Sequence, residues 1–188
     1  MARWDPGAEE RLKRAALELC LERGYDNVTV THIAERAGLT RRSYFRYFPD
    51  KREVLFAGSE RLPPALAEAV LAADPDAAPL AAVLDALARV GAQLVEYLDG
   101  ATERRALIDA SPELQERERT KAAAITEAIR DALLQRQVDA GTAGLVAQLA
   151  TVAWDNAFRR WIGARGEAGF GSCLDAVTDD LRAALAGA

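Results

Sequence analysis

Residues 29–51 read TVTHIAERAGLTRRSYFRYFPDK, and this stretch decides the fold of the amino-terminal part of the chain. Two segments in it, 30–37 and 41–47, have apolar residues at helical spacing, and Gly38 lies between them. A helix, a tight turn built on a glycine and a second helix are the pattern of a helix-turn-helix, whose second helix enters the DNA major groove. The stretch therefore predicts a DNA-reading element.

The segments around this stretch are also helical. We expect a first helix from Asp5-Pro6 to Gly24, and a fourth helix, capped by Asp50, that ends or kinks near residues 61–62 because Pro63-Pro64 follows. The remainder is rich in alanine and leucine, and no segment alternates apolar and polar residues over the length of a strand. The sequence predicts an all-α chain of about nine helices.

Charge is unevenly distributed along the 188 residues. The net charge is −5, from 24 Lys/Arg and 29 Asp/Glu. Residues 1–56 hold 11 Lys/Arg against 9 Asp/Glu, a net of +2, which leaves 13 against 20, a net of −7, for the rest. Five basic residues and one acid lie between positions 41 and 52. A polyanionic partner is therefore expected at the amino-terminal face, because the acidic remainder would be repelled by a duplex.

Composition and motifs exclude several other classes. No apolar stretch reaches the roughly 20 residues that span a bilayer, and no signal peptide is evident, so we expect a cytoplasmic protein without membrane contact. Cys20 and Cys173 are expected to be core residues. One histidine, His32, and the lack of CxxC, HExxH, GxSxG or P-loop spacing predict no metal, no cofactor and no catalytic residues.

The amino-terminal motif resembles the tetracycline-repressor-like (TetR) regulators. The resemblance covers roughly residues 8–56 and rests on a threonine-led Ile-Ala helix, an Ala-Gly-Leu-Thr turn, an aromatic run and a downstream lysine and leucine. These stand here as Thr29, Val30, Ile33, Ala34, Ala37, Gly38, Leu39, Thr40, Ser43, Tyr44, Phe45, Tyr47, Phe48, Lys51 and Leu55. It implies a DNA-binding three-helix domain at 1–56 and a helical ligand-binding and dimerisation domain at 57–188.

The resemblance also implies roles for single residues. Caps at Thr29 and Thr40 would touch phosphates, Tyr47 and Lys51 would contact the DNA backbone, and the start of the second helix would reach base edges. The expected DNA-binding set is Thr29, Thr40, Arg41, Arg42, Ser43, Tyr44, Tyr47 and Lys51. The family usually has tyrosine where Phe45 stands, so the roles of Phe45 and of Tyr44 beside it stay open.

The carboxy-terminal part is expected to supply a dimer and a pocket. Large apolar residues on the last two helices favour a dimer interface, with internal core as the alternative; they are Phe158, Trp161, Leu174, Val177 and Leu181. Family members usually hold a ligand among the middle helices, for which polar or aromatic candidates are Tyr97, Arg104, Arg105, Trp154 and Asn156. Alternatively, Arg104 and Arg105 lie at the solvent-exposed start of a helix and line no pocket. Pro63-Pro64 is the expected hinge.

The sequence leaves three functions open. The first is a homodimeric, sequence-specific transcriptional regulator that binds an operator in double-stranded DNA. In its most specific form, this regulator is a repressor that a small-molecule effector releases from DNA. A DNA-binding dimer without an effector is the second. A helical enzyme that uses the carboxy-terminal pocket is the third, and the sequence offers it no nucleophile with a base.

Overall fold

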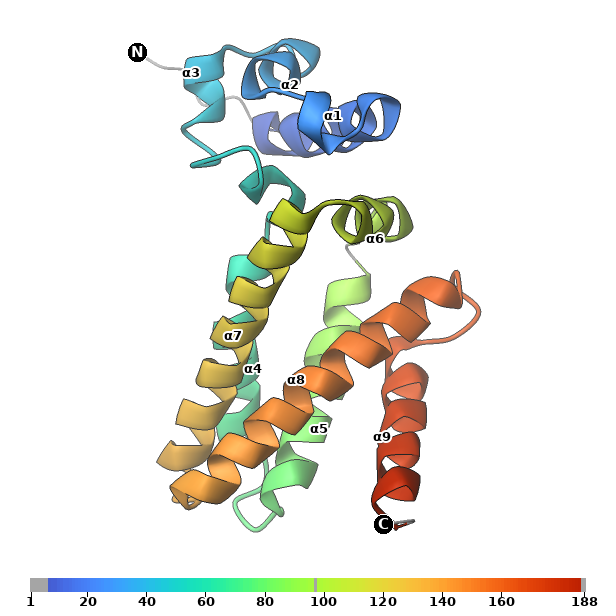
Figure 1. The fold of residues 1–188 in the computed structure, drawn as a ribbon. Helices are drawn as coiled ribbons and strands as arrows, with labels where there is room; N and C mark the ends of the chain where they lie inside the picture. Colours follow the sequence, from blue (N-terminus) through green and yellow to red (C-terminus); the bar gives the residue numbers. More distant parts are fainter. Residues whose placement is uncertain (1–6, 97, 187–188) are drawn as a thin grey trace. The chain divides into compact units, whose positions relative to one another are not determined.

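The computed structural model describes residues 7–96 and 98–186. These residues form nine α-helices and three short 3-10 helices and contain no strand, which confirms the predicted all-α class (Figure 1). The chain divides into two compact units, Met1–Gly58 with Gly100–Arg119, and Ser59–Asp99 with Thr120–Ala188. The expected start of the first helix at Asp5-Pro6 and the pocket candidate Tyr97 lie outside the described residues.

The first unit contains the predicted helix-turn-helix. Its amino-terminal helices are α1 (Ala8–Arg23), α2 (Val30–Arg36) and α3 (Arg41–Tyr44). Apolar residues at helical spacing on α1 and α2 pack together with residues of the turn that follows α3. This core includes Leu12, Ala16, Leu19, Cys20, Ile33, Ala34, Ala37, Phe48, Val54 and Leu55. Burial of these side chains fixes α2 and α3 on α1 and leaves their other faces in solvent.

Residues from the middle of the sequence complete this unit. Helix α6 (Ala101–Ala110) and the start of α7 (Pro112–Gln135) contribute Leu107, Ile108 and Leu114 to the same apolar core as α1 and α2. The compact unit is thus larger than the amino-terminal segment alone. Division of the chain into a DNA-binding part at 1–56 and a ligand-binding and dimerisation part at 57–188 stays a prediction about function.

The segment after the helix-turn-helix differs from the sequence prediction. No continuous fourth helix starts at Asp50: residues 53–56 and 59–61 form short 3-10 helices, separated by Gly58 with a φ of +87°. Helix α4 (Leu62–Leu71) then begins with Pro63 and Pro64 in its first turn. A short helical segment does end at Arg61, where the break was expected, and the two prolines belong to the start of the next helix. The first turn has no intrahelical acceptor for their N–H groups, so proline starts a helix without losing a bond.

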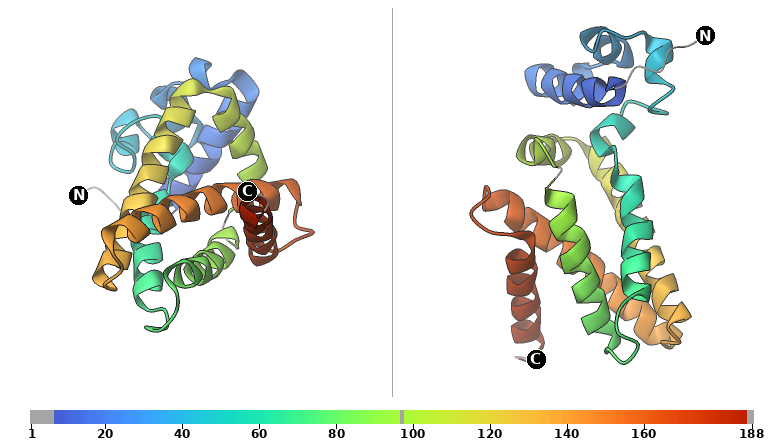
Figure 2. Two further views of the ribbon diagram at one scale, coloured as in Figure 1. Left: turned by 60° about the horizontal axis from the view of Figure 1, so that its bottom comes forward. Right: turned by 180° about the vertical axis from the view of Figure 1, so that it is seen from behind.

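The second unit is a packed group of long helices. Besides α4 and the later turns of α7, it contains α5 (Pro79–Val95), α8 (Ala140–Gly163) and α9 (Phe170–Ala186) (Figures 1 and 2). Helix α8 packs against both α5 and α9, and α4 lies along α5. Alanines on the inner face of α8 allow this close approach: Ala143, Ala147, Ala150, Ala153 and Ala157 are all buried.

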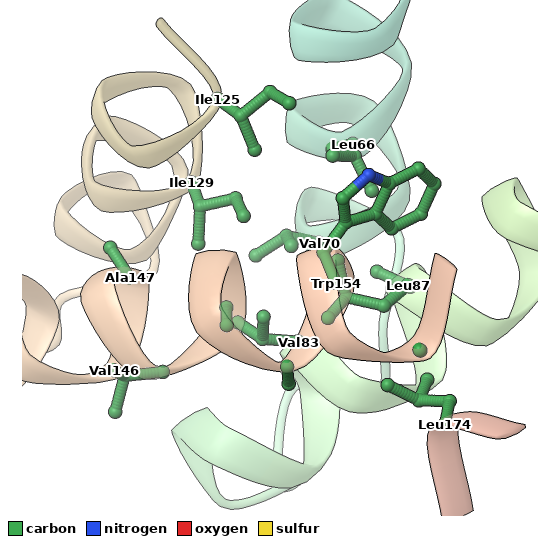
Figure 3. Packing of buried hydrophobic residues seen from close by; sticks show 14 of the residues in the cluster. Leu66, Val70, Val83, Leu87, Ile125, Ile129, Val146, Ala147, Trp154 and Leu174 are labelled. Carbon is green, nitrogen blue, oxygen red and sulfur yellow. The ribbon is translucent and has the colours of Figure 1, made fainter. Parts of the chain in front are cut away.

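Trp154 is the largest side chain that α8 contributes to this core. It is 8% exposed, and its ring centroid lies 5.0 Å from that of Phe170 at the start of α9. Figure 3 shows it projecting from α8 among residues of the apolar cluster that include Leu66, Val70 and Leu87. Trp154 therefore joins the helices of the second unit through apolar packing.

Candidate DNA-binding surface

The turn between α2 and α3 is built as the sequence predicts. Gly38 has a φ of +69°, a left-handed conformation that glycine adopts without steric cost. The N–H of Leu39 donates to the carbonyl of Ala34 at 2.8 Å, and the N–H of Gly38 donates to that of Glu35 at 3.0 Å. These bonds satisfy the last carbonyls of α2 and direct the chain into α3.

Both predicted threonine caps are present. The hydroxyl of Thr29 accepts from the N–H of His32 at 3.2 Å, and the hydroxyl of Thr40 accepts from the N–H of Ser43 at 3.1 Å. His32 has a role that the sequence did not reveal: its Nδ1 accepts from the N–H of Thr29 at 3.3 Å, which completes a reciprocal capping box. Contact of either threonine with phosphate stays a prediction.

The exposed side of α3 and of the turn after it carries arginine and aromatic side chains. Arg41, Arg42 and Arg46 are exposed, and no described acidic residue pairs with any of the three. The guanidinium of Arg41 lies 5.5 Å from the ring centroid of Phe45, and that of Arg46 lies 5.9 Å from the ring centroid of Tyr47. Unpaired guanidinium groups beside aromatic faces suit a polyanion.

Tyr44 does not belong to this exposed face. Its side chain is fully buried, and its hydroxyl donates to the carbonyl of Asp50 at 3.0 Å. Burial raises the pKa of the Tyr44 phenol, with the nearby Asp50 charge as a smaller cause in the same direction. The expectation that Tyr44 reaches base edges is corrected, because its ring fills the core, and Phe45, 45% exposed, is the outward-facing aromatic.

Lys51 is also held within the unit. Its Nζ donates to the carbonyl of Tyr25 at 3.0 Å and lies 3.7 Å from the centroid of the Tyr25 ring. The Tyr25 hydroxyl in turn donates to Glu113 of α7 at 3.2 Å. This internal contact, 26 residues away in sequence, was not predicted, and a contact of Lys51 with phosphate stays a prediction.

The last basic residue of the run, Arg52, is paired with carboxylates. It forms an ion pair with Asp50 at 2.9 Å and lies 3.6 Å from Glu113. Burial alone would raise the pKa of Asp50, but hydrogen bonds from Arg52 and from backbone N–H groups hold that pKa below its usual value. Glu53 beside it is bonded to Arg117 of α7. The cationic face available to DNA is therefore Arg41, Arg42 and Arg46.

The described pocket candidates belong to two different compact units. Arg104 and Arg105 belong to the first compact unit, whereas Trp154 and Asn156 belong to the second. Arg105 is bonded to Glu118 at 2.5 Å and to Asp109 at 2.7 Å, and burial lowers the pKa of Arg104. Asn156 is exposed and donates to the carbonyl of Val152 at 2.8 Å. A ligand pocket formed by these candidates stays a prediction.

The predicted dimer residues divide into two groups. Leu174 and Val177 are 2% and 4% exposed and pack within their own unit, which corrects the expectation that they face a partner. Three are half-buried at the edge of the same core, namely Phe158, Trp161 and Leu181. Sequence reasoning missed the exposed leucines and valine on the outer face of α8, Leu145, Leu149 and Val152, although their i, i+4, i+7 spacing marks one helix face.

The described part of the chain contains neither a metal-binding cluster nor a membrane-spanning helix. Within residues 7–96 and 98–186, no three His, Cys, Asp or Glu side chains are placed to hold a metal ion. No helix in those ranges has the length and apolar character needed to cross a membrane.

Comparison with known proteins agrees with this geometry. Residues 12–57 match the family described as bacterial regulatory proteins, tetR family. YdeS of Bacillus subtilis (strain 168), named an uncharacterized HTH-type transcriptional regulator, is 34% identical over 64 residues, which are 31% of this chain and 32% of YdeS. The chain matches about a third or less of the length of its curated relatives.

Solved structures extend the likeness in fold to almost the whole chain. NalD, the secondary repressor of the MexAB-OprM multidrug efflux pump in Pseudomonas aeruginosa, has a TM-score of 0.62 at 16% identity, over 93% of this chain and 94% of NalD. SmeT in complex with triclosan has a TM-score of 0.61 at 19% identity, over 93% of this chain and 91% of SmeT. The amino-terminal region, which carries the helix-turn-helix and its exposed arginine face, thus matches the tetR family of bacterial regulatory proteins over residues 12–57.

Proposed function

We propose that this protein is a homodimeric, sequence-specific DNA-binding transcriptional regulator, and that it acts as a repressor released by a small-molecule ligand. The observation that carries DNA binding is the set of exposed guanidinium groups on α3 and the following turn. Arg41, Arg42 and Arg46 have no acidic partner among the described residues, while Arg52 pairs with Asp50 and Lys51 donates to the carbonyl of Tyr25. This selective exposure leaves a cationic surface where a helix-turn-helix meets a duplex.

A salt titration of DNA binding tests the proposal. Each arginine that contacts a phosphate releases counterions, so Arg42→Gln and Arg46→Gln should each lower affinity and reduce the slope of log K against log salt by about one. Arg182→Gln is the matched control, since Arg182 is exposed on α9 and pairs with Asp179. Equal slopes for all three variants and the unaltered protein would refute this DNA-binding face.

Support for a homodimer comes from the outer face of α8. Leu145 is 66% exposed, Val152 is 49% exposed and Leu149 between them is 38% exposed. One helical stripe of exposed apolar side chains suits a dimer interface with two-fold symmetry. Such a dimer would place one helix-turn-helix on each of two DNA half-sites. Leu145→Asp with Val152→Asp should produce a monomer in sedimentation and weaken operator binding. Leu71→Asp, at a 42% exposed position on α4, is the control that should leave the dimer intact.

The ligand-responsive part rests on likeness of fold to a structure solved with a small molecule, SmeT with triclosan. A DNA-binding dimer without an effector is the second candidate function, favoured by the dense apolar packing around Trp154. A thermal-shift screen against apolar and amphipathic compounds, triclosan included, separates the two. A compound that raises the melting temperature and also releases operator DNA supports the ligand-released repressor. A screen without any such compound favours the ligand-independent dimer.

A further inference from the structure

The exposed ring of Phe45 lies beside Arg41 on the surface proposed to bind DNA. Positions 41 and 45 are one helical turn apart, and the Arg41 guanidinium carbon is 5.5 Å from the ring centroid. Phe45 has no hydroxyl to donate to a phosphate, and 45% of it is exposed. An exposed phenylalanine on this surface therefore needs a role other than that of a phosphate-binding tyrosine.

We propose that Arg41 and Phe45 form one base-reading pair, in which Arg41 binds a guanine and Phe45 both orients Arg41 and packs on the methyl group of a neighbouring thymine. This inference rests on the proposed DNA-binding function and adds the bases that the surface reads. Arginine is the side chain that donates two hydrogen bonds to guanine O6 and N7, and phenylalanine makes apolar contact with the thymine methyl in the major groove.

Geometry distinguishes Arg41 from its neighbour Arg42. Arg41 lies over the Phe45 face, which limits the directions that its guanidinium samples before DNA arrives. A restricted side chain loses less entropy when it binds, so it discriminates bases better than a freely rotating one. No described aromatic ring lies under Arg42. Arg42 is accordingly a phosphate contact, and Arg41 is the residue that specifies a base.

The ring that supports Arg41 is itself held in place. Tyr44 meets Phe45 edge to face, with ring centroids 5.6 Å apart and planes at 82°. The Tyr44 ring is buried and anchored through its hydroxyl to the carbonyl of Asp50. A buried tyrosine followed by an exposed phenylalanine therefore fixes one side of the Phe45 ring and leaves another open to DNA.

Selection of bound sequences from a random DNA pool tests the pair. The full chain should enrich a site with a guanine beside a thymine, and Arg41→Lys should reduce the preference for that guanine about tenfold with the salt slope unchanged. Arg42→Lys is the matched control and should keep the preference. Phe45→Leu should weaken it by about threefold, as loss of the cation–π contact predicts, while Phe45→Tyr, which keeps the ring face, should restore it.

The thymine contact has its own readout. Replacing that thymine by uracil removes only the methyl group and should lower the affinity of the unaltered protein by about fourfold. Phe45→Ala should bind the two DNAs equally. Unchanged melting temperatures would show that the variants fold, which is expected because Phe45 and Arg41 are exposed.

The outcomes separate this inference from the function on which it rests. A chain that enriches no sequence overturns the proposed function and the reading pair together. A chain that enriches a site without guanine, or whose guanine preference survives in Arg41→Lys, keeps the function and overturns the pair. The same holds if Phe45→Leu and the uracil substitution leave base preference and affinity unchanged.

Discussion

Lys51 Nζ lies 3.7 Å from the centroid of the Tyr25 ring and donates to the carbonyl of the same residue at 3.0 Å. One cation thus donates to a backbone carbonyl at the start of the turn after α1 and lies over an aromatic face. Tyr25 is 4% exposed, so the contact is at the edge of the core. The link joins the segment after the helix-turn-helix to the segment before it.

We expect Lys51→Met to destabilise the chain by about 1–3 kcal/mol, because it removes a charge-assisted hydrogen bond and a cation–π contact while keeping the apolar stem. Denaturant unfolding followed by circular dichroism measures the change. Lys13→Met is the matched control: Lys13 pairs with Glu10, which is 66% exposed, and such pairs contribute little. Equal losses in the two variants would contradict a structural role for Lys51.

A second prediction concerns the Tyr44 hydroxyl. Tyr44→Phe leaves the partly buried carbonyl of Asp50 without this donor, so we expect unfolding free energy to fall by about 0.5–1.5 kcal/mol. Tyr47→Phe should leave stability unchanged, since the Tyr47 ring is only half-buried. Chemical denaturation of both variants decides the matter. A Tyr44→Phe protein as stable as the unaltered chain would show that water or another donor replaces the hydroxyl.

Tyr44 also shows how far sequence reasoning reaches. Caps at Thr29 and Thr40 and the glycine turn depend on local chemistry, and the structure confirms them. Helix α3 has only four residues, so no periodicity tells which of two adjacent aromatic residues, Tyr44 or Phe45, faces inward. The sequence therefore predicted helix α3 but not which of its aromatic residues is buried.

Long-range partners account for most of the remaining differences. Lys51 lies 26 residues from the carbonyl that it contacts, and Arg117 lies 64 residues from Glu53. Arg104 and Arg105 were expected near Trp154, yet residues 100–119 pack with the amino-terminal core through Leu107 and its neighbours. Contacts between residues so far apart in sequence leave no trace in the hydrophobic periodicity of either segment. The spacing of residues along the chain therefore could not show which side chains pack together.

A third prediction follows from burial of Cys20. Burial raises the pKa of the Cys20 thiol from 9.0 to about 11, although the charge of Lys51 acts in the opposite direction. The unfolded chain therefore releases this proton at lower pH than the folded chain. The stabilisation is fully present below pH 9 and is lost as pH rises to about 11, by about 2–3 kcal/mol.

Unfolding free energy measured between pH 8 and 11, about the range in which a thiol titrates, checks this expectation. Tyr25 and Tyr44, whose pKa values burial also raises, extend the loss to higher pH. Cys20→Ala should be less stable at neutral pH, because it leaves a cavity, but should show a shallower decline across the alkaline window. An equally steep decline in Cys20→Ala would assign the pH dependence to other groups.

The last prediction concerns the contact between Gly91 of α5 and Phe170 of α9. A Cβ at Gly91 would lie 2.2 Å from two carbons of the Phe170 ring, which is 2% exposed and packed on Trp154. Gly91→Ala gains up to about 1 kcal/mol in helix propensity but forces the ring to move, so we expect a net loss of about 1–3 kcal/mol. Gly144→Ala in α8 meets nothing within 4 Å and should instead be neutral or stabilising. Adding Phe170→Leu should recover part of the stability that Gly91→Ala loses in thermal unfolding, because the smaller side chain leaves room for the new methyl group. If Phe170→Leu only deepens that loss, a neighbour other than Phe170 sets the spacing of α5 and α9.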